Sequence, residues 1–263
     1  MSQPVRAVER ALDILLCFTC EQPVRSMTQI AQSIHMSKTT VHRLLATLEK
    51  RRFLTRDQIT GLYRLGFRFI EMASLVLQDV ELHRWAEPYL RRLAAECGET
   101  VDLSILDGSQ VMYLQVIESP QRLKLAAAVG QRLPAFCTAS GKALLAYLPE
   151  EKVRKVLRED LKRYTAHTKT SIREILDDLR ITRARGYALS DQEYEKDINA
   201  VAAPIFDAEN HPIAAIAIVG PSFRLTKERL PKLGESIRRL TREIASEVGV
   251  VALSAIITRP RIP

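Results

Sequence analysis

Long apolar runs are absent from this sequence of 263 residues. No stretch approaches the ~20 consecutive apolar residues that a membrane-spanning helix needs, so we expect no membrane partner. The first ten residues also lack the apolar core of a secretory signal peptide. We therefore expect the chain to work in the cytoplasm.

Cysteine is scarce as well, with Cys17, Cys20, Cys97 and Cys137 as the four in the sequence. Positions so widely scattered do not suit a disulfide framework. Cys17 and Cys20 form a C-x-x-C pair, but no second Cys pair or His pair lies nearby to complete a metal site. We interpret both as buried thiols and expect neither a metal nor a cofactor.

Acidic residues are outnumbered, and the excess of basic residues is uneven. The whole chain has 39 Lys and Arg against 31 Asp and Glu. Residues 1–66 alone contain ten Lys and Arg against five Asp and Glu. A quarter of the chain therefore carries most of the excess positive charge, which indicates an anionic polymer as its partner.

One predicted helix in this basic part has two different faces. Its apolar face has the helical spacing i, i+3, i+4, i+7 and comprises Val41, Leu44, Leu45 and Leu48. Ser37 precedes it at the expected N-cap position. The opposite face of its first two turns is polar and cationic, with Lys38, Thr39, Thr40, His42 and Arg43. A DNA recognition helix presents its N-terminal residues in this way, although an ordinary amphipathic helix can share the pattern.

The neighbouring segments favour the DNA-binding interpretation. A first helix is predicted over residues 5–19, with one apolar face formed by Val5, Val8, Leu12, Leu15, Leu16 and Thr19. Ser26 and Gln29 form a capping box that opens a short second helix. Residues 53–65 read as a β-hairpin, on which Arg56 and Arg64 could contact phosphates. Together these elements predict a winged helix-turn-helix.

The rest of the chain predicts an α+β domain with a central antiparallel sheet. After Gly66 comes a strongly apolar helix, which we expect either the second domain or a second copy of the chain to cover. A dimer is the simpler choice, because recognition helices usually work in pairs. Strands are predicted over residues 101–105, 111–116, 123–128, 199–206 and 213–219. Helices are predicted over residues 143–147, 150–157, 171–186 (opened by a Ser171–Glu174 capping box) and 227–253.

Motifs along nearly the whole chain match one protein family. The N-terminal motifs are Val8-Glu9-Arg10-Ala11-Leu12, Lys38 to Leu45 and Leu62 to Gly66. The later motifs are Leu133-Pro134, Ser140 to Ala146, Arg185-Gly186-Tyr187, Ala202 to Asp207 and Gly220-Pro221. In this order they resemble the IclR family of transcriptional regulators.

The resemblance implies how the chain is divided and what it binds. Residues 1–66 would form the DNA-binding domain and residues 67–82 a linker helix that dimerises. Residues 83–257 would form a GAF-like effector-binding domain, and residues 258–263 a tail. Dimers or tetramers of such a regulator bind double-stranded promoter DNA, and a small effector shifts their affinity.

The resemblance also implies an effector site between two walls. One wall is a loop and helix start, whose backbone N–H groups could hold a carboxylate, formed by Thr138, Ala139, Ser140 and Gly141. The other wall comprises Ser190, Ala200, Ala217 and Val219. Only one of these four side chains is polar, which favours a carboxylic acid with an apolar or aromatic body. Two residues depart from the family pattern: Asp197 replaces a usual glycine, and Ala200 a usual cysteine or serine.

The alternative is a metabolite-binding protein or enzyme whose basic N-terminal domain serves assembly. Cys137 beside Ser140 could suggest a nucleophile, but the nearest downstream histidine, His167, has no matching third member. We therefore expect no catalytic residues. Lys142 is expected on the solvent side of its helix, in a structural role.

Overall fold

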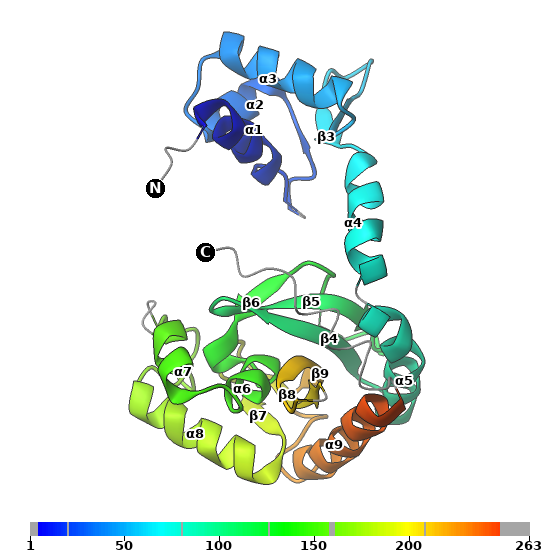
Figure 1. The fold of residues 1–263 in the computed structure, drawn as a ribbon, viewed down its shortest axis with the longest axis vertical. Coiled ribbons are helices and arrows are strands. Elements are labelled where there is room, and N and C mark those ends of the chain that lie inside the picture. Colours follow the sequence, from blue (N-terminus) through cyan, green and yellow to red (C-terminus); the bar gives the residue numbers. More distant parts are fainter. Residues whose placement is uncertain are drawn as a thin grey trace. The chain divides into compact units, whose positions relative to one another are not determined.

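The computed structural model describes residues 5–19, 21–79, 81–125, 127–157, 161–207 and 209–247, without the side chains of residues 74–85 and 247. The chain separates into two compact units, Met1–Asp79 and Val80–Pro263 (Figure 1). Cys20, the end of the last predicted helix and the tail at residues 258–263 lie outside the described residues. No described helix is long and apolar enough to cross a membrane.

The first unit has the predicted winged helix-turn-helix. Its helices are α1 (Arg6–Leu16), α2 (Met27–Ser33) and α3 (Lys38–Lys50), followed by α4 (Arg68–Asp79). Its antiparallel sheet has the order β1 (Val24–Arg25), β3 (Tyr63–Leu65), β2 (Leu54–Arg56). Ser26 and Gln29 form the predicted capping box at α2, and the Ser37 hydroxyl caps α3.

The core of the first unit joins all three of its first helices to the hairpin. Its most buried residues are Ile14, Ile30, Val41, Leu45 and Leu54. The predicted apolar face of α3 is therefore confirmed, with Leu48 buried and Leu44 partly buried. The apolar face predicted for the first helix mostly points outward instead, since Val5, Val8, Leu12 and Leu16 are 52–76% exposed. Cys17 is half-buried rather than buried.

The second unit is built on a six-stranded antiparallel sheet with the order β6-β5-β4-β9-β8-β7. The strands are β4 (Thr100–Asp107), β5 (Gln110–Ile117), β6 (Arg132–Pro134), β7 (Ala188–Asp191), β8 (Ile198–Phe206) and β9 (Pro212–Pro221). The helices are α5 (Glu81–Cys97), the 3-10 helix η1 (Ala135–Cys137), α6 (Ala139–Leu145), α7 (Glu150–Val156), α8 (Ile172–Arg185) and α9 (Leu230–Glu247).

Helices cover both faces of this sheet (Figure 1). One apolar core lies between the sheet and α5 and α9, and a second lies between the sheet and α6, α7 and α8. Strands β8 and β9 are consequently buried at nearly every position. The polar residues of β4, which alternate with Val101 and Leu103, are buried as well: Thr100, Asp102 and Ser104 are at most 1% exposed.

Five features of this unit differ from the sequence predictions. The third strand is β6 at residues 132–134 and not at 123–128, where the described residues form no strand, and β7 was not predicted. Helix α6 begins at Ala139 rather than 143, because Thr138 caps it. Helix α9 begins at Leu230 rather than 227. Ser171 occupies the N-cap of α8 but its side chain makes no capping hydrogen bond.

Candidate functional site

The front of α3 is an exposed cationic surface. Lys38, Thr39, His42 and Arg43 are all exposed at its N-terminal end. None of these four side chains has an ion-pair or hydrogen-bond partner among the described residues. Their polar groups are therefore available to a ligand outside the unit.

Two other predicted DNA contacts, Ser37 and Thr40, hold the helix start together. The Ser37 hydroxyl accepts a hydrogen bond from the Thr40 amide across 3.4 Å, and the two hydroxyl oxygens are 3.0 Å apart. These bonds satisfy groups that the first turn of a helix leaves free. Ser37 and Thr40 thus fix the place where the cationic front begins.

The wing presents its two arginines on opposite faces. Arg56 pairs with Tyr63 across the hairpin, and its guanidinium lies 5.7 Å from the centroid of that ring. Arg64 pairs with Thr55, so it points to the other side of the two strands. At the turn between them, Asp57 accepts hydrogen bonds from the amides of Ile59 and Thr60, and the Thr60 bond in particular lowers the pKa of Asp57.

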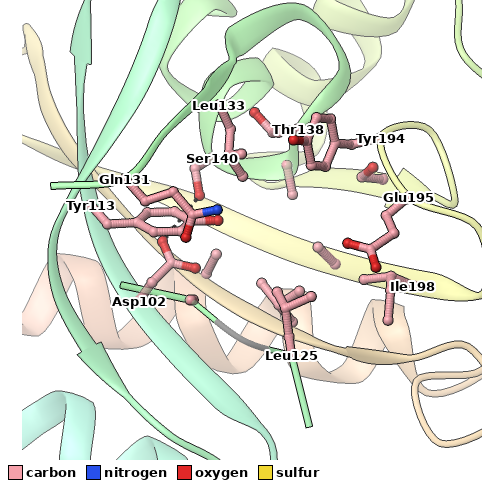
Figure 2. A pocket seen from close by; sticks show the side chains of 16 residues that line it. Asp102, Tyr113, Leu125, Gln131, Leu133, Thr138, Ser140, Tyr194, Glu195 and Ile198 are labelled. Atoms are coloured by element: carbon pink, nitrogen blue, oxygen red, sulfur yellow. Dashed lines mark hydrogen bonds between the residues drawn. The ribbon is translucent and has the colours of Figure 1, made fainter. Parts of the chain in front are cut away.

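The second unit contains a cavity between the sheet and the segment before α6 (Figure 2). The space not filled by atoms is about 580 Å³, part of it open to solvent. Its lining comprises Asp102, Tyr113, Leu125, Ala127, Gln131, Leu133, Thr138, Ala139, Ser140, Ser190, Tyr194, Glu195, Ile198, Ala200, Ala217 and Val219. A cavity with mostly apolar walls and a few polar groups is typical of a small-molecule site.

Seven of the eight residues predicted for the effector site line this cavity. Ser190, Ala200 and Val219 are neighbours across β7, β8 and β9, while Ala217 pairs with Asp102 of β4. Gly141 is the exception. Its amide donates to the Thr138 hydroxyl across 3.3 Å, and a Cβ there would lie 2.1 Å from the Ala135 carbonyl oxygen. Gly141 therefore allows α6 to pack against η1 and does not face the cavity.

The sequence prediction missed nine lining residues. The most important is Asp102, which alternates with the apolar residues Val101 and Leu103 of β4 and was not considered as a site residue. Both faces of the sheet are covered, so Asp102 is buried instead. Leu125 and Ala127 come from the wrongly predicted third strand, while Tyr194 and Glu195 follow the missed strand β7.

Asp102 is a buried acid without a basic partner. Burial raises its pKa to about 7, an effect that the hydroxyls of Ser104 and Ser140 only partly offset. Burial, and then the nearby charge of Asp102, also raise the pKa of Tyr113, so that ring stays a neutral phenol. None of the described residues that line the cavity is a Lys, Arg or His.

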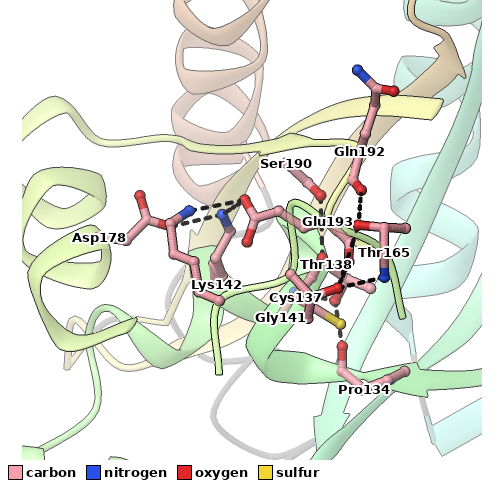
Figure 3. A network of polar contacts seen from close by, with 12 residues as sticks. Pro134, Cys137, Thr138, Gly141, Lys142, Thr165, Asp178, Ser190, Gln192 and Glu193 are labelled. Atoms are coloured by element: carbon pink, nitrogen blue, oxygen red, sulfur yellow. Dashed lines mark hydrogen bonds and ion pairs between the residues drawn. The ribbon is translucent and has the colours of Figure 1, made fainter. Parts of the chain in front are cut away.

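A second group of buried charges lies behind the cavity wall (Figure 3). Lys142 is 1% exposed, and its ammonium pairs with the carboxylates of Asp178 and Glu193. Lys169 approaches the same two carboxylates, at 3.4 Å and 3.2 Å. The expectation that Lys142 faces solvent is therefore wrong. Burial raises the pKa of Asp178, but Lys142 and Lys169 outweigh it and leave that pKa lowered.

The neighbouring residues do not form a catalytic or metal site. Cys137 is fully buried, and burial raises the pKa of its thiol to about 12, which suppresses the thiolate needed for a nucleophile. Its carbonyl accepts a hydrogen bond from the Ser190 hydroxyl across 3.1 Å. Within the described ranges, no group of three or more His, Cys, Asp or Glu residues is placed to hold a metal ion.

Both units of the chain match known protein families. Residues 74–246 match the family described as bacterial transcriptional regulator IclR C-terminal, and residues 7–58 match the IclR helix-turn-helix domain. The chain belongs to the IclR family. It is 34% identical over 242 residues to the HTH-type transcriptional regulator BhcR of Paracoccus denitrificans, covering 92% of this chain and 86% of that one.

Two further IclR-family relatives cover nearly the whole chain. The transcriptional repressor IclR of Escherichia coli is 32% identical over 248 residues, which is 93% of this chain and 90% of that one. The crystal structure of the Thermotoga maritima IclR has a TM-score of 0.77 at 29% identity, covering 93% of this chain and 99% of that one. This IclR-family chain is thus a DNA-binding transcriptional regulator with an effector domain, and the interpretation as an enzyme is not supported.

Proposed function

We propose that this regulator contacts promoter DNA through α3 and the wing, and that a small molecule in the cavity modulates the contact. One observation supports the DNA part of the proposal. One face of α3 carries exposed cations without partners among the described residues, and its other face is apolar and buried. The proposed DNA-contacting residues are Ser37, Lys38, Thr39, Thr40, His42, Arg43, Arg56 and Arg64. We propose the cytoplasm as its location, since promoter DNA is its target.

We propose that successive segments of the chain have different roles. Residues 1–66 bind DNA, residues 67–82 link and dimerise, and residues 83–257 bind the effector. The exposed apolar residues of the first unit support self-association. Val5, Val8, Leu12 and Leu16 recur at helical spacing along α1, and Phe67 and Ile70 at the start of α4 are 77% and 62% exposed. Apolar surface of this extent is typical of an interface, and a dimer places two recognition helices on two half-sites.

The proposed effector is a small organic acid with an apolar or aromatic body. Leu125, Leu133 and Ile198 give the cavity apolar walls, and Ala200 and Ala217 leave room for a ring. The proposed effector-binding residues are Thr138, Ala139, Ser140, Ser190, Ala200, Ala217 and Val219. Gly141 stays with them only as a packing residue, for the reasons given above.

Removing the two cations of α3 tests the DNA part. The Lys38→Ala/Arg43→Ala variant should lose at least tenfold in affinity for a duplex selected by the wild-type chain from a random pool. The slope of log K against log salt should also become shallower, because fewer phosphate counterions are released. Fluorescence anisotropy over a salt series measures both quantities.

A matched control removes the same charge elsewhere. Lys152 and Lys155 are exposed on α7 of the second unit, and their double alanine variant should keep the wild-type affinity. If both double variants lose affinity equally, net charge rather than α3 determines binding. If Lys38→Ala/Arg43→Ala binds as well as wild type, the proposed contact surface is wrong.

A further inference from the structure

Asp102 is the most deeply placed polar residue of the cavity. It lies within β4, between β5 and β9, and is 1% exposed. Its carboxylate accepts a hydrogen bond from the Ser140 hydroxyl across a long 3.5 Å, and the hydroxyl of Ser104, two residues along β4, also lowers its pKa. A carboxylate can accept about four hydrogen bonds, so Asp102 keeps unused acceptor capacity beside the cavity.

Two of the hydroxyls that line the cavity are already engaged. The Ser190 hydroxyl donates to the Cys137 carbonyl, and the Thr138 hydroxyl donates to the Pro134 carbonyl. The nearest buried cation on α6, Lys142, is paired with Asp178 and Glu193 (Figure 3). Among the described residues, no cation therefore compensates the negative charge of Asp102. A ligand can supply the missing positive charge or hydrogen-bond donor.

The chemistry of that ligand follows from the buried charge. An ionised carboxylate in a confined apolar site is stabilised by hydrogen-bond donors or by positive charge. A ligand carboxylate beside Asp102 would instead place two like charges close together. The far end of the cavity differs, because Glu195 there is exposed and Lys196 follows it (Figure 2). An acid group on the ligand is compatible with this solvent-facing end.

We propose that Asp102 selects effectors that present a hydroxyl or amino group to the inner end of the cavity, with any acid group at the Glu195 end. This assignment rests on the proposed effector function of the cavity. It narrows the effector class from aromatic acids in general to rings that carry a hydrogen-bond donor opposite the acid. Asp102 is then the residue that determines this specificity.

The test compares probes that share a ring and differ in the donor. Calorimetry on the full chain at pH 8, where Asp102 is mostly ionised, uses 4-hydroxybenzoate and 4-aminobenzoate, with benzoate as the donor-free member. We expect the donor-bearing probes to bind at least tenfold more tightly than benzoate, because hydrogen bonds to a charged acceptor are the strong ones. This comparison needs no substitution, so it decides the question even if an Asp102 variant does not fold.

Two variants then locate the effect. Asp102→Asn should reduce the preference for donor-bearing probes, and Asp102→Ala should remove it. Asp107→Asn makes the same chemical change at the exposed end of the same strand and should keep the wild-type preference. Benzoate binding as tightly as the donor-bearing probes, or a preference that Asp102→Asn leaves unchanged, would overturn the proposal. Silence from every donor-bearing probe at millimolar concentration would overturn it too.

A DNA arm separates this inference from the proposed function. The affinity of wild-type protein for its selected duplex is measured with and without each probe. Probes that bind with the expected preference but leave DNA affinity unchanged would contradict effector control and support Asp102 as the selecting residue. DNA affinity that responds to benzoate as strongly as to 4-hydroxybenzoate would support effector control and overturn the selection by Asp102.

Discussion

The carboxylates that contact α6 differ in whether a cation compensates their charge. Asp178 and Glu193 share the ammonium groups of Lys142 and Lys169. Asp102, reached from the same helix by Ser140, has no cation near it among the described residues. A compensated buried charge can be explained by the fold alone, whereas an uncompensated one costs stability and requires another reason. We therefore interpret the group around Lys142 as structural, and Asp102 as a residue that binds a ligand.

Removing the central cation should have the largest effect. Lys142→Met keeps the length of the side chain but leaves Asp178 and Glu193 with only Lys169, which is 34% exposed. Breaking a buried ion pair from one side costs about 3–5 kcal/mol in the free energy of unfolding. Denaturant titration measures this loss. The control is Lys155→Met, whose exposed pair with Glu151 should contribute less than about 1 kcal/mol. Equal losses of stability in both variants would mean that the buried pairs of Lys142 contribute no more than an exposed pair.

Neutralising Asp102 should increase the free energy of unfolding, in contrast to Lys142→Met. A shift of the Asp102 pKa from 3.8 to about 7 corresponds to about 4 kcal/mol of destabilisation by the ionised form. Asp102→Asn should therefore stabilise the unliganded protein at pH 8, by roughly 2–4 kcal/mol because the buried amide has its own cost. Thermal and denaturant unfolding at pH 8 measure this change.

The pH dependence gives the same comparison a second test. Because the pKa of Asp102 is higher in the folded than in the unfolded chain, the folded state takes up the proton first. Stability from this group should rise as pH falls from 8 through about 7, and level off below 3.8. Acids with a lowered pKa, such as Asp178, have the opposite effect, because their contribution to protein stability is lost as pH falls. The measured quantity is therefore the difference in the free energy of unfolding between wild type and Asp102→Asn at each pH. A pH-independent difference would contradict the burial of an ionisable Asp102.

A second uncompensated acid in the cavity should abolish ligand binding. Val219 is 8% exposed on β9 and lines the cavity. Val219→Asp should cost roughly 1–3 kcal/mol of stability and eliminate binding of the aromatic probes. Val219→Asn introduces a polar group without a charge, so it separates the effect of charge on binding from that of polarity. It should bind the probes more tightly than the Asp variant. Unchanged calorimetric affinity in Val219→Asp would remove β9 from the site.

Removing the outer lysine should have the smallest effect. Lys169→Ala leaves both carboxylates paired with the fully buried Lys142. Since Lys169 is about one-third exposed, its loss should cost no more than about 1 kcal/mol. A loss as large as that of Lys142→Met would mean that the two lysines act as one unit.

The first unit was largely predictable because its signals are local. The caps at Ser26 and Ser37 and the apolar spacing of α3 depend on residues within one or two helical turns. The orientation of α1 was not predictable in this way. Its apolar residues outnumber the positions that the small core can accept, so the face with Ile14 is buried and the face with Leu12 is left outside.

The chemistry of the cavity depended on long-range packing. Alternation along β4 predicted one apolar and one polar face, but the helices on both sides of the sheet bury Asp102 together with Leu103. Lys142 was likewise assigned to solvent, because its partners Asp178 and Glu193 lie 36 and 51 residues further along the chain. The walls that resemble the family were found, while the burial of Asp102 and the partners of Lys142 came from the structure.

Cys137 gives the sensing unit a further property, concerning oxidation. Its thiol lies behind the cavity wall, and with a pKa near 12 almost none of it is thiolate at neutral pH. Oxidants and electrophiles react with the thiolate, so this position resists sulfenylation and alkylation while the fold is intact. The second unit therefore carries next to its cavity a sulfur that oxidative stress leaves unchanged.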